Sequence, residues 1–172
     1  LEDKKTEKQE EPTSFLHYVK TIQRKMNSQR GDELPVSEFV EYADGTMPVG
    51  TAAFEKRGVG IQSPRWNPEG CVQCNACSLV CPHACIRPLV ICEEEREHAP
   101  EGTFTELRGM NNRLFAITVS PLDCTGCGNC ADICPGNKKN NVLEMIPSGE
   151  AMGQQPLYDY GESYENDSGV LN

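Results

Sequence analysis

The residues with the clearest chemical potential are the ten cysteines, which all lie between positions 71 and 134. Eight of them form two runs of identical spacing. In each run two residues separate the first three cysteines, three residues precede the fourth, and a proline follows it. The runs occupy residues 71–82 and 124–135. Because thiolate sulfur is a strong ligand for iron and zinc, the repeat predicts two metal centres built from cysteine.

The spacing of both runs suits a 4Fe–4S cluster, a cube of alternating iron and sulfur. Three thiolates separated by two residues each can wrap a compact loop around one cube, whereas the fourth lies about a helical turn further on and points away. In two-cluster proteins the fourth cysteine therefore binds the cluster of the other run. We assign the first cluster to Cys71, Cys74, Cys77 and Cys134, and the second cluster to Cys124, Cys127, Cys130 and Cys81.

Two other uses of cysteine fit the pattern less well. Tetrahedral zinc sites usually leave roughly a dozen or more residues between two cysteine pairs, but here all four cysteines of a run are packed closely together. A disulfide framework is disfavoured because the first residues show no secretory signal, and thiols in the cytosol stay reduced. The iron–sulfur interpretation is therefore the strongest of the three.

Two cysteines, Cys85 and Cys92, exceed the eight that fill two cubes. We expect Cys85 to be a small buried residue beside a cluster, and Cys92 has no assignable role. Gly126 and Gly128 have no side chains, so backbone N–H groups there can approach the cluster sulfurs closely.

Charge and composition exclude several classes of function. The 172 residues carry 26 acidic and 16 basic side chains, and this net charge of −10 argues against a nucleic-acid partner. No apolar run approaches the roughly 20 residues that cross a bilayer, so we expect no membrane segment. Lys138 and Lys139 form the only adjacent lysine pair near a cluster, and they are a candidate docking point for another protein. The alternative is that they lie in a solvated loop.

Outside the loops, the cysteine region predicts an α+β domain. Strands are expected at residues 63–67, 86–91, 116–119 and 142–145. Each half of this region has the order strand, cluster loop, helical turn, strand. Two such halves give a pseudo-two-fold domain of the bacterial-ferredoxin type over residues 65–146. Residues 93–112 exceed what a minimal two-cluster domain needs, and we expect them to be a charged, exposed insertion.

The remainder of the chain divides into a linker, an arm and a tail. Residues 1–11 are a charged linker, and residues 12–64 an arm that contains a helix followed by irregular chain rich in glycine and proline. An irregular segment of this length is expected to lie across another surface. Residues 147–172 are an acidic tail, expected to be loose unless a partner orders it. Three tyrosines could anchor that tail: Tyr158, Tyr160 and Tyr164.

Several motifs together resemble the ferredoxin-type domain of pyruvate:ferredoxin oxidoreductase. They are DGTMPVGT at residues 44–51, FEKRG at 54–58, the two cysteine runs, and CPHACIRP at 81–88, so that the resemblance covers about residues 34–146. In that family thiamine diphosphate with Mg²⁺ supports the decarboxylation of pyruvate, coenzyme A accepts the acetyl group, and electrons leave through three 4Fe–4S clusters. The resemblance implies that this chain carries the two outer clusters and no catalytic residue.

The resemblance also implies what surrounds this chain. Thiamine diphosphate, Mg²⁺, coenzyme A and the third cluster would be bound by the remaining domains of the 2-oxoacid oxidoreductase, which would form a homodimer. Electrons would pass to an external ferredoxin or flavodoxin-type acceptor, or to a fused flavin module, in the cytoplasm or in an anaerobic organelle. The alternative is a free-standing two-cluster carrier, although such a carrier would not need the long irregular arm.

Overall fold

The computed structural model describes residues 13–164, and it divides the chain into two compact units between Lys56 and Arg57. The sequence places the corresponding boundary after residue 64, which lies within the first strand of the second unit. Among the described residues, no helix combines the length and the apolar character needed to cross a bilayer.

The first unit is built on the helix that the three- and four-residue spacing of apolar side chains predicts. Its helical segments are α1 (Thr13–Tyr18), η1 (Val19–Gln23, a π-helical turn), α2 (Arg24–Asn27), and the 3₁₀ turns η2 (Gly31–Glu33), η3 (Val36–Tyr42) and η4 (Thr51–Phe54). Val19 and Ile22 are almost fully buried.

Part of the irregular arm lies across this helix. The Tyr18 ring meets the Tyr42 ring edge-on, with 5.1 Å between centroids, and the Tyr18 hydroxyl donates to Met47 Sδ at 3.3 Å. The Gln23 amide donates to the Thr51 carbonyl at 2.8 Å. The helix of this unit therefore supplies a surface that residues 42–51 cover.

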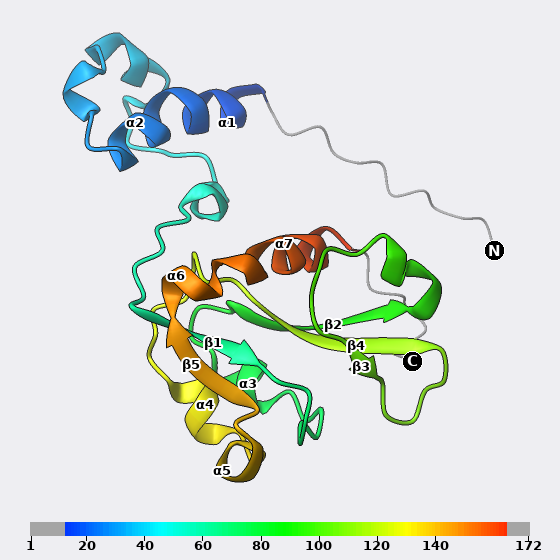
Figure 1. Cartoon of the computed structure of the whole chain (residues 1–172). Coiled ribbons are helices and arrows are strands. Elements are labelled where there is room, and N and C mark those ends of the chain that lie inside the picture. The colour runs from blue at the N-terminus through cyan, green and yellow to red at the C-terminus, as the bar shows by residue number, and fades with distance from the viewer. Residues whose placement is uncertain (1–12, 165–172) are drawn as a thin grey trace, which may run out of the picture. The chain divides into compact units, whose positions relative to one another are not determined.

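The second unit contains two small antiparallel sheets (Figure 1). One pairs β1 (Gln62–Trp66) with β5 (Leu143–Pro147), and the other has the order β2 (Ile86–Cys92), β4 (Arg113–Val119), β3 (Thr105–Glu106). In the first sheet Arg65 faces Glu144 across the strands and forms an ion pair with it at 2.6 Å. The two sheets and the short helices around them confirm the predicted α+β class.

The helical elements of this unit lie between and after the strands. They are α3 (Ala76–Val80), η5 (Glu93–Glu97), α4 (Asn129–Ile133), α5 (Asn137–Asn140), α6 (Ser148–Ala151), η6 (Met152–Gln154) and α7 (Gln155–Ser163). The core is made of apolar side chains from both sheets and from α7, and Trp66 meets Phe115 edge-on in it, with 5.9 Å between centroids. Five cysteines pack against this core: Cys71, Cys77, Cys81, Cys130 and Cys134.

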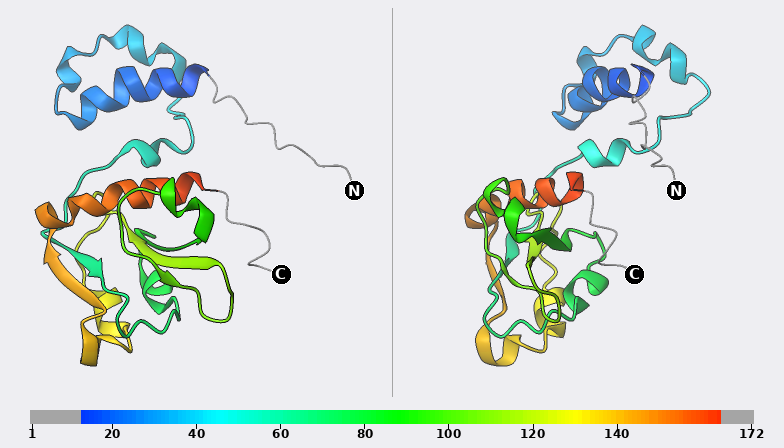
Figure 2. Two further views of the ribbon diagram at one scale, coloured as in Figure 1. Left: turned by 45° about the vertical axis from the view of Figure 1, so that its right-hand side comes forward. Right: turned by 90° about the vertical axis from the view of Figure 1, so that its right-hand side faces the viewer.

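The C-terminal region differs from the loose acidic tail that its composition predicts. Residues 148–163 form α6, η6 and α7, and α7 lies along the three-stranded sheet (Figure 2). Leu157 and Tyr158 are only 6% and 3% exposed there. The surface that orders this region is therefore a sheet of the same chain. The charged linker and residues 165–172 of the predicted tail lie outside the described residues.

Leu157→Ala is expected to lower the free energy of unfolding by about 2–5 kcal/mol, because it leaves a cavity between α7 and the core. Denaturant titration of the anaerobic protein, followed by circular dichroism, measures this change. Leu79→Ala is the matched control, since Leu79 is 86% exposed and its truncation should cost no more than about 0.5 kcal/mol. Equal effects of the two substitutions would contradict the packing of α7.

Candidate iron–sulfur centres

The two cysteine runs adopt the same local backbone conformation. In each run the first two cysteines lie in a loop, the third lies in a short helix, α3 or α4, and the fourth follows that helix directly. Left-handed residues recur at equivalent positions, Gln73 and Asn75 (both φ 57°) in the first run and Gly126 and Gly128 (φ 72° and 81°) in the second. The sequence repeat is therefore also a repeat of backbone shape.

The cysteine side chains group across the two runs. Burial raises the pKa of Cys77 to about 12, and the nearby Cys130, Cys134 and Cys71 add to this rise. Burial likewise raises the pKa of Cys130 to about 11, with added contributions from Cys124, Cys81 and Cys127. The third cysteine of each run thus has the fourth cysteine of the other run as a neighbour. Binding of iron has to displace a proton from these thiols, because both are protonated at neutral pH.

A small hollow of about 20 Å³ lies beside the second of these groups. Its lining includes the four cysteines assigned to the second cluster and, among nine further residues, Cys85, Pro64, Ile86 and Met145. No three His, Cys, Asp or Glu side chains of residues 13–164 converge on a point that a single metal ion could occupy. A cube binds each cysteine through a different iron, so its ligands need not share one point.

A buried polar group beside this hollow also fits a sulfur-rich cluster. Ser63 is fully buried, and its hydroxyl has no hydrogen-bond partner of ordinary geometry within the protein. The hydroxyl lies close enough to Cys124 to lower the pKa of that thiol. Sulfur atoms of an iron–sulfur cluster accept hydrogen bonds of this kind, so the residues around the hollow suit such a group.

Cys85 lies against two of the predicted ligands. It is 4% exposed, as expected of a small buried residue, and its Sγ is 3.3 Å from Cys81 Sγ. A hydrogen bond from Cys85, helped by the Gly126 N–H at 3.4 Å, lowers the pKa of Cys124 to about 6. The same bond to Cys124, together with burial, raises the pKa of Cys85. Cys85 therefore stays a thiol and donates its hydrogen to the Cys124 sulfur.

Other residues singled out in the sequence lie outside these groups. Cys92 ends β2, and its sulfur accepts a hydrogen bond from Arg113, a structural contact that no sequence pattern predicts. Lys138 and Lys139 are exposed on α5, close after Cys134. The side chain of Asn137 fixes this helix by bonding the backbone of Leu143 through both its oxygen and its nitrogen, at 2.6 and 2.9 Å.

Two families match this chain. Residues 70–138 match the family described as "4Fe-4S dicluster domain", and residues 2–60 match the family called "EKR", a domain of unknown function. The first match contains all eight cysteines of the two runs.

Larger oxidoreductases are similar to most of the chain. It is 46% identical over 144 residues to pyruvate-flavodoxin oxidoreductase of Klebsiella pneumoniae, and 46% identical over 157 residues to pyruvate:ferredoxin oxidoreductase of Moorella thermoacetica. A pyruvate dehydrogenase [NADP(+)] of Cryptosporidium parvum is 43% identical over 157 residues. These alignments cover 83%, 87% and 89% of this chain. The chain spans only 12%, 13% and 8% of the three relatives.

Gly126→Ala and Gly128→Ala form a matched pair of tests for the second loop. Both residues are left-handed, so alanine strains the backbone by about 1–2 kcal/mol at either position. A Cβ at residue 126 would also lie 2.8 Å from the Gln62 carbonyl oxygen, whereas one at residue 128 would meet nothing within 4 Å. We expect Gly126→Ala to lose iron and Gly128→Ala to keep it, as measured by iron content and visible absorption. Equal retention in the two variants would show that the close approach to Gln62 is unimportant.

Proposed function

Because residues 70–138 belong to the 4Fe-4S dicluster domain family, we propose that this chain carries electrons through two clusters as one part of a 2-oxoacid oxidoreductase. The observation that carries the proposal is the grouping of Cys77 and Cys130 with cysteines of both runs. Such crossing would place the two clusters side by side. The clusters supply one-electron oxidation and reduction.

The ligands proposed for the first cluster are Cys71, Cys74, Cys77 and Cys134, and those for the second are Cys124, Cys127, Cys130 and Cys81. Support comes from the neighbours of the two buried thiols and from the hollow that the second set lines. The matching left-handed residues of the two loops support the pseudo-two-fold relation between the halves. With all eight of these thiols bound to iron, the clusters would offer no open position for a substrate.

In the complete enzyme, we propose that the remaining domains bind thiamine diphosphate, Mg²⁺ and coenzyme A and pair as a homodimer. Support comes from relatives named for pyruvate, of which this chain spans about an eighth or less. The relatives' names include flavodoxin, ferredoxin and NADP(+), and a ferredoxin or flavodoxin-type carrier in the cytoplasm is the acceptor proposed here. Lys138 and Lys139 are its proposed docking point, because both are exposed just beyond a proposed ligand.

The relay function has a direct test. In the anaerobic chain with both clusters assembled, dithionite should bleach the visible absorption. Pyruvate with coenzyme A, thiamine diphosphate and Mg²⁺ should leave the chain oxidised, because cleavage beside a ketone needs an electron sink that the missing domains would bind. Adding those domains should restore bleaching by pyruvate. Bleaching by pyruvate in their absence would refute the relay proposal.

Cys134→Ser tests the crossed ligation. The substitution should free Cys71, Cys74 and Cys77 for alkylation and leave the second run protected, and iron should fall from about eight to about four per chain. Mass spectrometry after alkylation identifies the freed thiols. Cys85→Ser and Cys92→Ser are the controls, and both should keep about eight irons. Release of Cys124, Cys127 and Cys130 by Cys134→Ser would show that each run binds its own cluster.

A further inference from the structure

The loop of the first run is held by the segment that its composition predicts to be an exposed insertion. The Gln73 amide donates to the Glu106 carbonyl at 2.8 Å, and the Arg108 N–H donates to the Gln73 side-chain oxygen at 2.9 Å. The Arg108 guanidinium also donates to the Cys71 carbonyl at 3.0 Å. Gln73 occupies the left-handed conformation that Gly126 adopts in the second run, and its side chain makes this anchor.

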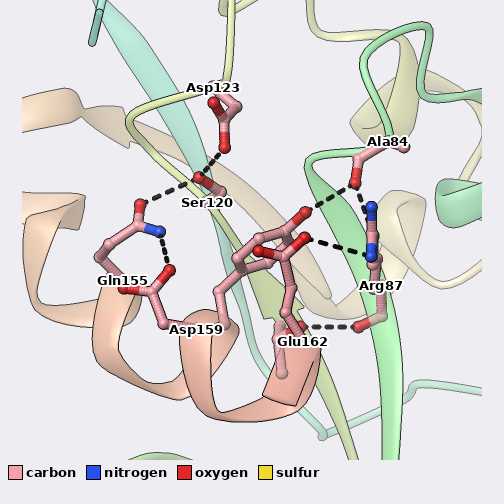
Figure 3. Close-up of polar contacts among 9 residues, drawn as sticks. Ala84, Arg87, Ser120, Asp123, Gln155, Asp159 and Glu162 are labelled. Carbon is pink, nitrogen blue, oxygen red and sulfur yellow. Dashed lines mark hydrogen bonds and ion pairs between the residues drawn. The ribbon is translucent and has the colours of Figure 1, made fainter. Parts of the chain in front are cut away.

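Helix α7 holds the chain that follows Cys81, the cysteine of the first run that is assigned to the second cluster (Figure 3). The Tyr158 hydroxyl, on a side chain that is nearly fully buried, donates to the Ala84 carbonyl at 3.0 Å. Arg87 Nε donates to the same carbonyl at 3.1 Å, and its guanidinium forms an ion pair with Glu162 at 3.2 Å. Ala84 is left-handed, with φ 50°, and it lies three residues after Cys81. Helix α7 therefore fixes the chain that leaves this proposed ligand.

The same helix also fixes the turn that leads into Cys124. The Ser120 hydroxyl lies 3.0 Å from Gln155 Oε1 and 2.6 Å from Asp123 Oδ2, and it can donate its one hydrogen to either (Figure 3). The Leu122 N–H donates to Gln155 Oε1 at 3.4 Å. The Cys124 N–H in turn donates to the Ser120 carbonyl at 3.1 Å. One face of α7 therefore reaches both chain segments that carry Cys81 and Cys124, two of the ligands proposed for the second cluster.

We infer that two segments outside the cysteine repeat act as separate positioning elements, residues 106–108 for the first cluster and α7 for the second. This inference rests on the proposed ligand assignment. Arg108 and Tyr158 act through backbone carbonyls, so they are positioning residues and not ligands. The position of each loop determines which backbone N–H groups can donate to the cluster sulfurs and how much water reaches them. These hydrogen bonds and this exposure control the stability and the reduction potential of a cluster. The two sets of contacts share no residue, so each can change alone.

Arg108→Met and Tyr158→Phe test the inference, since each removes a side-chain donor to one loop carbonyl. The full chain with both clusters is treated anaerobically with an iron chelator and iodoacetamide, and mass spectrometry follows alkylation of each cysteine. Tyr158→Phe should speed release of the four cysteines of the second cluster about tenfold and leave the other four unchanged. Arg108→Met should speed release of the four cysteines of the first cluster and leave those of the second unchanged. Arg108→Lys, which keeps a donor, should restore part of the protection of the first cluster.

Tyr160→Phe is the matched control, because it removes a hydroxyl from the same helix, on a ring that stacks on Tyr164 instead of bonding Ala84. It should leave every rate unchanged. A redox titration followed by magnetic resonance should show a shifted potential for one cluster only in each test variant. Equal acceleration of all eight cysteines, or of none, would overturn the inference alone. If the unaltered chain already releases its cysteines in other groupings, the ligand assignment is wrong, and the inference is wrong with it.

Discussion

The close approach of the two cysteine runs is the constraint on which the rest of this fold depends. Cys77 and Cys130 each have cysteines of both runs as neighbours, although the runs are separated by residues 83–123. Strand pairing brings them together, because β2 leaves the first run and pairs antiparallel with β4, which enters the second. Helices α3 and α4 then lie against each other. A change in strand register would therefore move whole sets of thiols, and not a single one.

Much of this arrangement could be predicted from the sequence, because it depends on short-range patterns. The cysteine spacing, the β-prone runs and the apolar spacing of the first helix are visible in single segments. α7 could not be predicted in this way. Its acidic, polar composition is typical of a tail, and its stability depends on Leu157 and Tyr158 meeting a sheet formed by distant strands. The acceptor that Tyr158 bonds is a backbone carbonyl, which leaves no trace in the sequence.

The two runs reach the same backbone shape by different means. The second uses glycine at both left-handed positions, where the absence of a side chain removes the steric cost. The first uses Gln73 and Asn75 instead, and the side chain of Gln73 is bonded on both its oxygen and its nitrogen. Sequence reasoning recognised the glycines and overlooked Gln73, because only alignment of the two runs residue by residue marks it as the counterpart of Gly126.

The pairing of β1 with β5 has a consequence for how this unit can be built into longer polypeptides. Gln62 precedes the first run and Pro147 follows the second, and the register places the two residues opposite each other. The chain therefore enters and leaves the cysteine region at neighbouring points, as is common in domains that tolerate insertion into other proteins. Helix α7 follows β5 but packs back on the core of this region and bonds the Ala84 carbonyl, so the region needs α7 as well. Sequence added before β1 or beyond α7 would therefore leave the spacing of the cysteine loops unchanged.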